Sequence, residues 1–296
     1  MFEKKGTNRG ARTIARRILG GLCALSLVLV ALGAVMPAQA ETHVFPKKET
    51  TERMYSRVEP EIMNGFLPVC YSAKASGQVV AFTIDDCNQA SNLRDIIKLF
   101  KKYGGTATIF PIGENVSFLK DILKSAWEDG FEIENHTWDH SGLYHENDQG
   151  MVNQIWSQNR AVSEALGVSY QMHFLRPRDG NDRNDIRTHA YLNQLGYYGI
   201  AHWSVMATGA KLDTLKDSLA PGEMFAFHCT DEDVKLMKEF LPYALDQGYQ
   251  LVTMNALFGY EENAASPLTD DPRTRAVEPL GAYEMDYRTM QNPTYS

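Results

Sequence analysis

Short apolar runs alternate with longer amphipathic segments through the middle of the chain. The apolar runs have strand length and cover residues 79–84, 106–110, 131–134, 173–175, 199–203, 224–227 and 251–254. The segments between them have helix length and cover residues 91–103, 116–129, 149–166, 183–195, 212–219 and 231–247. Continuous apolar strands that alternate with helices are typical of a parallel sheet buried on both faces. The pattern therefore predicts an α/β fold with one catalytic domain, a (β/α)7 barrel one unit short of eight rather than an open sheet.

The stretches on either side of this region lack the alternation. Residues 41–74 have no clean periodicity, and we interpret them as a linker and N-terminal lead-in to a domain that covers residues 75–258. Residues 259–296 are polar, contain four prolines and carry no apolar stripe. Such a segment cannot bury enough apolar surface to form a core, so it predicts a mostly disordered or surface-draped tail.

The first forty residues predict export from the cytoplasm. Six basic residues precede an apolar run over 18–36, and Ala38-Gln39-Ala40 provides the small-x-small pattern of a signal-peptidase site. We expect a signal peptide over residues 1–40 and a bacterial protein that is secreted or associated with the cell envelope. A retained membrane anchor is the alternative, because the apolar run is longer than the ~7–15 residues of a typical signal core.

Charge restricts the partners of the exported chain. The whole chain has 29 basic and 37 acidic residues, and removal of residues 1–40 takes away six basic residues and one acidic residue, which leaves a net charge of −13. A strongly negative surface repels phosphate backbones and anionic lipids. We expect no nucleic-acid partner, no stable membrane partner after signal cleavage, and a monomer.

Two acidic residues and two histidines suggest a metal site. Asp85 and Asp86 end the first apolar run, and His136 and His140 follow the third. One carboxylate and two imidazoles with open positions form a recurring hydrolytic metal site. Adjacent strand side chains point in opposite directions, so both acids cannot normally bind one ion. If the backbone turns at the strand end, Asp86 can face the ion while Asp85 remains free to act as a base.

The motifs resemble those of the polysaccharide deacetylases, the carbohydrate esterases of family 4 that share the NodB homology domain. The segment 83–86 is similar to their T-F-D-D-G motif, and 136–140 matches their H-[ST]-x-x-H motif. Residues 175–180, 201–204 and 226–228 resemble, in the family's order, the R-P-P-Y-G segment, the start of the tryptophan motif and the L-x-H motif. The resemblance covers roughly residues 75–258 and implies a distorted (β/α)7 TIM-like barrel of the NodB-homology type.

The resemblance also implies an activity and a role for each matching residue. It implies a metal-dependent hydrolase that removes acetyl groups from an N-acetylhexosamine glycan such as peptidoglycan, with zinc as the expected metal. The roles implied are metal ligation by Asp86, His136 and His140, base catalysis by Asp85, acid catalysis by His228, orientation of the base by Arg176, and a substrate pocket formed by Trp203, Asp179 and Ala226.

Several residues depart from the family's pattern. Cys87 and Asn88 replace Gly-Pro, Arg178 and Asp179 replace Pro-Tyr, and Ala226 replaces Leu. Residues 206–209 lack the acid that in the family tunes the general-acid histidine. Two alternatives follow: a metal- and glycan-binding protein with weak chemistry, or a hydrolase of small non-sugar amides on the same fold.

Three cysteines remain after residue 40: Cys70, Cys87 and Cys229. An odd number leaves at most one disulfide in an exported protein. Cys87 follows the Asp pair and Cys229 follows His228. Both would therefore lie at the opening of the candidate site and could form a disulfide bridge. The alternative is three small buried thiols.

Overall fold

The computed structural model describes residues 67–272. The predicted signal peptide, most of the predicted linker and the end of the predicted tail lie outside these residues. Within the described range, no helix is both long enough and apolar enough to cross a membrane.

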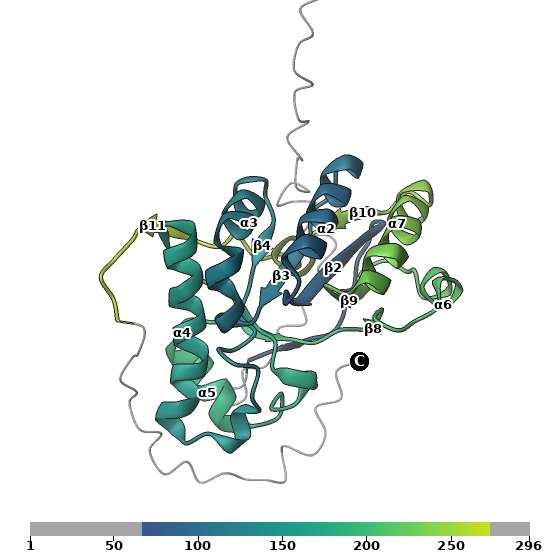
Figure 1. Cartoon of the computed structure of the whole chain (residues 1–296). Coiled ribbons are helices and arrows are strands. Elements are labelled where there is room, and N and C mark those ends of the chain that lie inside the picture. Colours follow the sequence, from purple (N-terminus) through teal and green to yellow (C-terminus); the bar gives the residue numbers. More distant parts are fainter. Residues whose placement is uncertain (1–66, 273–296) are drawn as a thin grey trace, which may run out of the picture. The chain divides into compact units, whose positions relative to one another are not determined.

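Parallel strands around β2 form the centre of the domain (Figure 1). The strands are β1 Val69–Cys70, β2 Val79–Asp86, β3 Thr108–Pro111, β4 Glu132–Ile133, β5 Val168–Tyr170, β6 Phe174–Leu175, β7 Gly199–Ala201, β8 Val205–Met206, β9 Met224–His228, β10 Gln250–Val252 and β11 Ala265–Pro267. All seven predicted strands are present, as β2, β3, β4, β6, β7, β9 and β10. The apolar runs predicted them because each strand is buried on both faces.

Helices connect most of the strands, as the amphipathic segments predicted. They are α2 Ala90–Tyr103, α3 Val116–Glu128, α4 Asp148–Leu166, α5 Ile186–Gln194, α6 Leu212–Asp217, α7 Asp231–Asp246 and α8 Met254–Phe258. Short 3-10 turns occur at η1 Gly113–Asn115, η2 Leu143–His145 and η3 Arg178–Gly180. Gly104 and Gly167 end α2 and α4 with φ values of 73° and 80°, a left-handed conformation that glycine adopts without steric cost.

The strands follow the path of a distorted barrel. One sheet has the order β4-β3-β2-β9-β8, with β10 paired to the start of β2, and a second has the order β1-β7-β6. A single parallel bridge between Asn135 and Leu175 joins the two sheets. Among residues 67–272 no pairing joins β1 to β8, so the barrel is not closed by hydrogen bonds. The predicted distorted barrel is confirmed, with its opening between β1 and β8.

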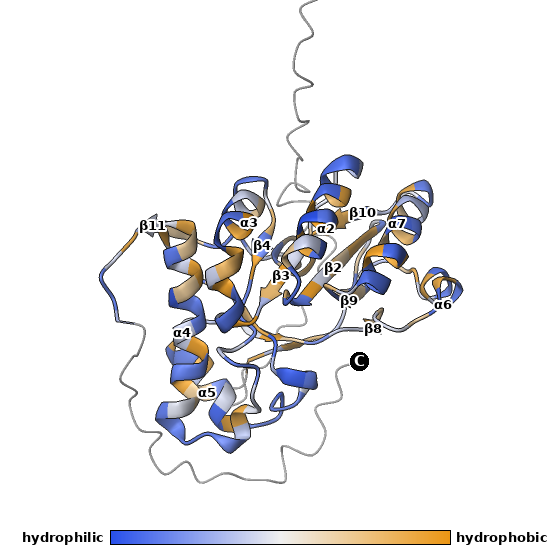
Figure 2. Ribbon diagram, viewed as in Figure 1, coloured by the Kyte–Doolittle hydropathy of each residue, from blue (hydrophilic) through white to orange (hydrophobic). Residues whose placement is uncertain are grey.

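An aromatic cluster packs the helices onto the central strands. Phe82 on β2 contacts Phe100 of α2, Phe225 and Phe227 of β9, and Phe240 of α7, with ring centroids 5.4–5.7 Å apart. All five rings are fully buried. Figure 2 shows hydrophobic residues concentrated in the strands and alternating with hydrophilic ones along the helices. This core holds β2 and β9 side by side, and both strands end at the candidate site.

Two short strands lie outside the predicted domain limits of 75–258. β1, in the predicted linker, pairs with β7 in parallel, with Val69 opposite Ile200. β11, in the predicted tail, pairs with β5 in antiparallel register, with Ser266 opposite Ser169. Residues 259–272 therefore run along the domain as ordered chain. The pattern missed both strands because one has two residues and the other has exposed side chains and no apolar run.

Candidate metal and catalytic site

A change of backbone conformation at the end of β2 separates the two acids. Asp86 and Cys87 have φ values of 62° and 57°, in the left-handed region that non-glycine residues rarely adopt. The Asp86 carbonyl accepts hydrogen bonds from the Ile112 backbone N–H and from Asn115 Nδ2. These contacts hold the turn, so Asp85 and Asp86 present their carboxylates to different partners. Strain of this kind is often found at functional sites.

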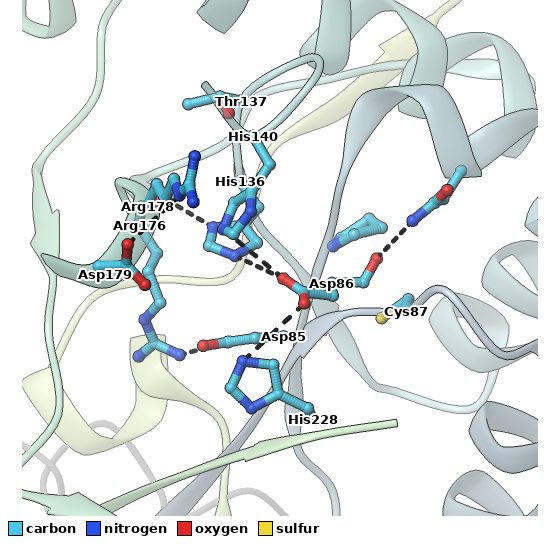
Figure 3. A network of polar contacts seen from close by, with 12 residues as sticks. Asp85, Asp86, Cys87, His136, Thr137, His140, Arg176, Arg178, Asp179 and His228 are labelled. Carbon is cyan, nitrogen blue, oxygen red and sulfur yellow. Dashed lines mark hydrogen bonds and ion pairs between the residues drawn. The ribbon is translucent and has the colours of Figure 1, made fainter. Parts of the chain in front are cut away.

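Asp86, His136 and His140 converge on one point (Figure 3). One ligand atom from each lies within 4.8 Å of the other two. Asp86 Oδ1 is 3.2 Å from His136 Nε2 and 3.7 Å from His140 Nε2. Burial acts to raise the pKa of Asp86, but the hydrogen bond and charge of His136, with the charges of His140 and His228, hold that pKa below its usual value. Asp86 is therefore ionised at neutral pH, as a ligand must be.

The position of His136, three residues after β4, is set by contacts of its ring and of the preceding residue. Its Nδ1 is 2.7 Å from the Arg176 backbone carbonyl, which can only accept a hydrogen bond, so Nδ1 carries the proton. The preceding residue, Asn135, donates to the Ile155 carbonyl and to the Tyr197 hydroxyl. When the ring is neutral, a proton on Nδ1 leaves Nε2 unprotonated on the side that faces Asp86, the form that binds a metal ion.

The loop that carries His140 is anchored from α4. Gln154 Oε1 accepts hydrogen bonds from the backbone N–H groups of Trp138 and Asp139, and Gln154 Nε2 donates to Asp139 Oδ2. His140 itself has a φ of 62°. Burial, together with the neighbouring His136, lowers the pKa of His140. A lowered pKa keeps the ring neutral and available as a ligand at neutral pH.

Asp85 forms a buried ion pair with Arg176. Arg176 Nη1 donates to Asp85 Oδ1 at 2.6 Å and to Thr83 Oγ1 at 2.6 Å, and Nη2 donates to the His202 carbonyl. Asp85 and Arg176 are 3% and 0% exposed, so little solvent screens the pair. The contact fixes the orientation of Asp85 beside the three clustered ligands (Figure 3).

His228 approaches the cluster from the end of β9. Its Nε2 is 4.0 Å from Asp86 Oδ2, and its Nδ1 is 2.9 Å from Thr208 Oγ1. Thr208 Oγ1 donates in turn to Asp233 Oδ2 at 2.8 Å. Sequence reasoning missed Thr208 and Asp233 because they lie 20 residues before and five residues after the histidine. In the sequence, Thr208 is only one of residues 206–209, where the family's pattern has an acid.

The three predicted pocket residues have different surroundings. Ala226 lies two residues before His228 on β9, on the same face of the strand, and is fully buried. The Trp203 ring stacks on His202 at 4.1 Å and lies 5.8 Å from the Arg176 guanidinium. Asp179 is largely exposed and pairs with Arg178 at 3.3 Å. The structure thus brings Ala226 and Trp203 next to the catalytic candidates, while Asp179 lies at the outer edge.

The predicted bridge between Cys87 and Cys229 is wrong. Cys70, Cys87 and Cys229 are buried free thiols, as the alternative interpretation had it. The Cys87 and Cys229 side chains lie within hydrogen-bond reach of each other, and burial raises the pKa of the Cys87 thiol. The two residues meet because each follows the last residue of a neighbouring strand, but a small buried thiol packs there without a covalent link.

The donor set fits a divalent ion of borderline softness. Two imidazole nitrogens and one carboxylate oxygen are ligands that zinc commonly accepts in catalytic sites, where further positions stay open. The Nδ1-protonated tautomer of His136 directs the correct nitrogen to the cluster, and His140 and Asp86 are partly exposed, which leaves access from solvent. Within residues 67–272, Asp86, His136 and His140 form the one group of three or more acidic, histidine or cysteine side chains that lie close enough together to share an ion.

Comparison with known proteins agrees with this geometry. Residues 72–200 match the sequence model of a family described as Polysaccharide deacetylase. The chain is 26% identical over 201 residues to the peptidoglycan-N-acetylmuramic acid deacetylase PdaC of Bacillus subtilis, and this match covers 64% of the chain but 41% of that relative. It is 27% identical over 192 residues to a peptidoglycan-N-acetylglucosamine deacetylase of Bacillus cereus, covering 60% of the chain and 68% of the relative.

Solved structures show the same fold. The crystal structure of BA3943, described as a CE4 family pseudoenzyme from Bacillus anthracis, superposes with a TM-score of 0.58 and 19% identity over 64% of the chain and 69% of that structure. The family match covers the segment that carries both ligand motifs and Arg176. The sequence match over residues 72–200, the curated relatives and the shared fold together support a divergent polysaccharide deacetylase.

Proposed function

We propose that this protein is a metal-dependent hydrolase that removes N-acetyl groups from N-acetylhexosamine glycans, with bacterial peptidoglycan or a similar polymer as the substrate. The names of the relatives, which are peptidoglycan deacetylases, support this substrate class. The observation that carries the proposal is the cluster of Asp86, His136 and His140 with an Arg-paired Asp85 and His228 beside it.

Asp86, His136 and His140 would hold the ion, with zinc as the expected metal. When bound, such an ion polarises a substrate carbonyl and makes water more acidic. Asp86 ends β2, and His136 and His140 lie in the loop after β4. A hydrogen bond holds the His136 ring, and hydrogen bonds to the backbone hold the turn at Asp86 and the loop that carries His140. The ligands are therefore positioned before the substrate arrives.

The remaining groups would move protons. Asp85, held in one orientation by Arg176, accepts a proton from the attacking water. The bond between the acetyl carbon and the sugar nitrogen breaks, and His228 Nε2 gives a proton to the departing nitrogen. The products are acetate and a free amine. Ala226 and Trp203 would flank the acetyl methyl group, and Asp179 would contact the glycan at the outer edge.

Acetate release tests this function directly. The zinc-loaded protein is incubated with N-acetylglucosamine oligomers, with purified peptidoglycan and with a panel of small amides and imides. We expect acetate from at least one glycan and a loss of at least ~100-fold in kcat for Asp85→Asn at equal zinc content, the scale of a general base. Turnover of small amides alone would identify the second enzymatic alternative.

A second candidate keeps the binding site without efficient chemistry. It is favoured by residues 206–209, which lack the acid that the family's pattern places there. Glycan binding of the same affinity in the wild type and in Asp85→Asn, with no acetate released from any substrate at full zinc occupancy, would support this candidate and reject the hydrolase.

We also propose that the protein acts outside the cytoplasm. The prediction depends on residues 1–40, which lie outside the described structure, and on relatives whose names refer to peptidoglycan. N-terminal sequencing of the exported protein should find Glu41 as the first residue. A first residue of Met1 in the membrane fraction would indicate the retained anchor instead.

A further inference from the structure

A hydrogen-bonded chain runs from His228 into the first turn of α7. His228 Nδ1 lies 2.9 Å from Thr208 Oγ1, which lies 2.8 Å from Asp233 Oδ2. The same carboxylate oxygen accepts the His228 backbone N–H at 2.8 Å, and Thr208 Oγ1 also accepts that N–H at 3.1 Å. Asp233 is 1% exposed. Both the ring and the backbone of His228 are therefore attached to one buried threonine–aspartate pair.

The chemistry of these groups sets the direction of the chain. An ionised carboxylate only accepts hydrogen bonds, and a threonine hydroxyl has one proton to give. Because the Thr208 hydroxyl donates to Asp233, its oxygen must accept from His228, and the proton of the neutral ring must lie on Nδ1. The other nitrogen, Nε2, then faces Asp86 Oδ2 at 4.0 Å with a free lone pair. Nε2 is therefore the atom that would take up a second proton, and the resulting imidazolium would give that proton to the departing nitrogen.

The position of Asp233 suits a buried negative charge. Asp233 lies in the first turn of α7, where the partial positive charge of the helix terminus favours an anion. Its backbone N–H is capped by Thr230 Oγ1 at 3.1 Å. Its second oxygen, Oδ1, is buried without a hydrogen-bond partner among the described residues. A buried oxygen left without a partner is costly in a purely structural residue, which points to a functional use of this acid.

We propose that Thr208 and Asp233 are positioning residues for His228, and that together they replace the acid missing from residues 206–209. Thr208 stands in that stretch and connects the ring to an acid supplied by α7. The pair fixes the rotation of the imidazole and keeps its proton on Nδ1, so that Nε2 serves the reaction. This inference depends on the proposed function only for the role of His228; the tautomer is a property of the protein itself.

Two variants of Thr208 test the relay by activity. Thr208→Val keeps the shape of the side chain and removes the hydroxyl, so we expect kcat to fall about 10- to 100-fold with KM changed less than about 2-fold. The loss should stay below the ~10²–10⁴-fold that a general acid itself contributes. Thr208→Ser restores the hydroxyl and should restore kcat. Asp233→Asn keeps an acceptor oxygen without the charge, and its kcat should fall between those of the wild type and Thr208→Val.

A matched control separates the relay from the stability of the turn. Thr230→Ala removes the cap of α7 next to Asp233 but touches neither the ring nor Thr208. It should lower the melting temperature while kcat stays within about 2-fold of the wild type, since an N-cap contributes ~1 kcal/mol to stability alone. If Thr230→Ala and Thr208→Val reduce kcat equally, the pair is merely structural and the proposal is overturned.

The tautomer gives a readout that does not depend on turnover. In zinc-loaded protein with ¹⁵N-labelled histidine, the His228 signals are assigned by their loss in His228→Gln. We expect a protonated Nδ1 and an unprotonated Nε2 for neutral His228 in the wild type and in Thr208→Ser, and a mixed or Nε2-protonated ring in Thr208→Val. The same tautomer in all of them overturns the relay. If the wild type releases no acetate, the proposed function fails, but this comparison still decides the inference.

Discussion

The contact between Asp85 and Arg176 places a full negative and a full positive charge in the interior. Arg176 is the largest fully buried side chain of the described residues, and its guanidinium also lies 4.3 Å from the Phe110 ring. Removing both charges from water is costly, and the cost is offset only while the pair stays intact. The acid is therefore held by a partner that the fold cannot lose without penalty.

This pairing predicts a strong coupling in stability. Arg176→Met should lower the free energy of unfolding by about 3–5 kcal/mol, because it leaves Asp85 buried without a counter-charge. Adding Asp85→Asn should recover part of that loss, since the remaining side chain is neutral. Urea unfolding of the two single variants and the double variant measures the coupling. Strictly additive losses would show that the two charges do not depend on each other.

Among single residues, the sequence predicted the three metal ligands but not the hydrogen bonds that orient them. Asp86, His136 and His140 carry a spacing that is legible in the chain, and the structure brings their ligand atoms together. The hydrogen bonds that orient them come from residues such as Asn135 and Gln154, whose amide side chains occur in many buried loops without any such role. The relay through Thr208 was missed for the same reason, because only the folded chain places it beside His228.

Two buried acids, Glu132 on β4 and Glu134 directly after it, lie in the apolar run 131–134 that predicted this strand. Glu132 Oε2 accepts the Asn255 backbone N–H, and Glu134 accepts the backbone N–H groups of His173 and Phe174 and the side chain of Asn263. These contacts join β4 to the chain before β6, to α8 and to the segment after α8. Burial raises the pKa of Glu132 to about 7 and that of Glu134 well above its usual value.

Glu132 makes stability depend on pH. Its pKa rises from about 4.5 in the unfolded chain to about 7 in the fold, so the folded protein holds more protons between these values. The resulting stability is complete below about pH 4.5 and is lost as the pH rises through 7. Each pKa unit corresponds to ~1.4 kcal/mol, so about 3 kcal/mol is at stake. Glu132→Gln should flatten the fall in melting temperature between pH 5 and 8; parallel curves for variant and wild type would contradict this origin.

We predict that Asn263 anchors the segment after α8 to the domain. Its side chain donates to Glu134 Oε1 at 2.7 Å and to the Gln171 carbonyl at 3.0 Å. Asn263→Ala leaves both acceptors without this donor, so we expect a loss of about 1–3 kcal/mol in unfolding free energy and an unchanged kcat. Ser266→Ala, at an exposed position of β11, is the control and should alter stability by less than about 0.5 kcal/mol. Equal effects of the two changes would show that Asn263 does not anchor the segment.

The described fold is longer at both ends than the region predicted from the sequence. Strand–helix alternation found residues 75–258 because each unit there has an apolar strand and an amphipathic helix. β1 and β11 add pairing without adding an apolar run, which is why periodicity could not reveal them. The opening of the barrel between β1 and β8 could not be predicted either, because β1 and β8 have two residues each and no apolar run predicted them.

The strands at both ends of the described fold predict a difference in thermal stability between two fragments. A fragment of residues 67–272 retains β1 and β11 and should melt in one cooperative transition. A fragment of residues 75–258 exposes the edges of β7 and β5 and removes Asn263 from Glu134, so it should melt at a lower temperature or aggregate. Circular dichroism during heating compares them. Identical melting temperatures would show that the added strands contribute nothing to the fold.

The central claim is that Asp86, His136 and His140 hold one metal ion for hydrolysis. Zinc content after dialysis, measured by elemental mass spectrometry, tests it in the wild type, in Asp86→Ala, in His140→Ala and in His145→Ala, an exposed histidine outside the cluster. We predict about one zinc per chain in the wild type and in His145→Ala, and far less in the other two, as expected when a ligand is removed. Equal zinc in all four proteins would contradict the account.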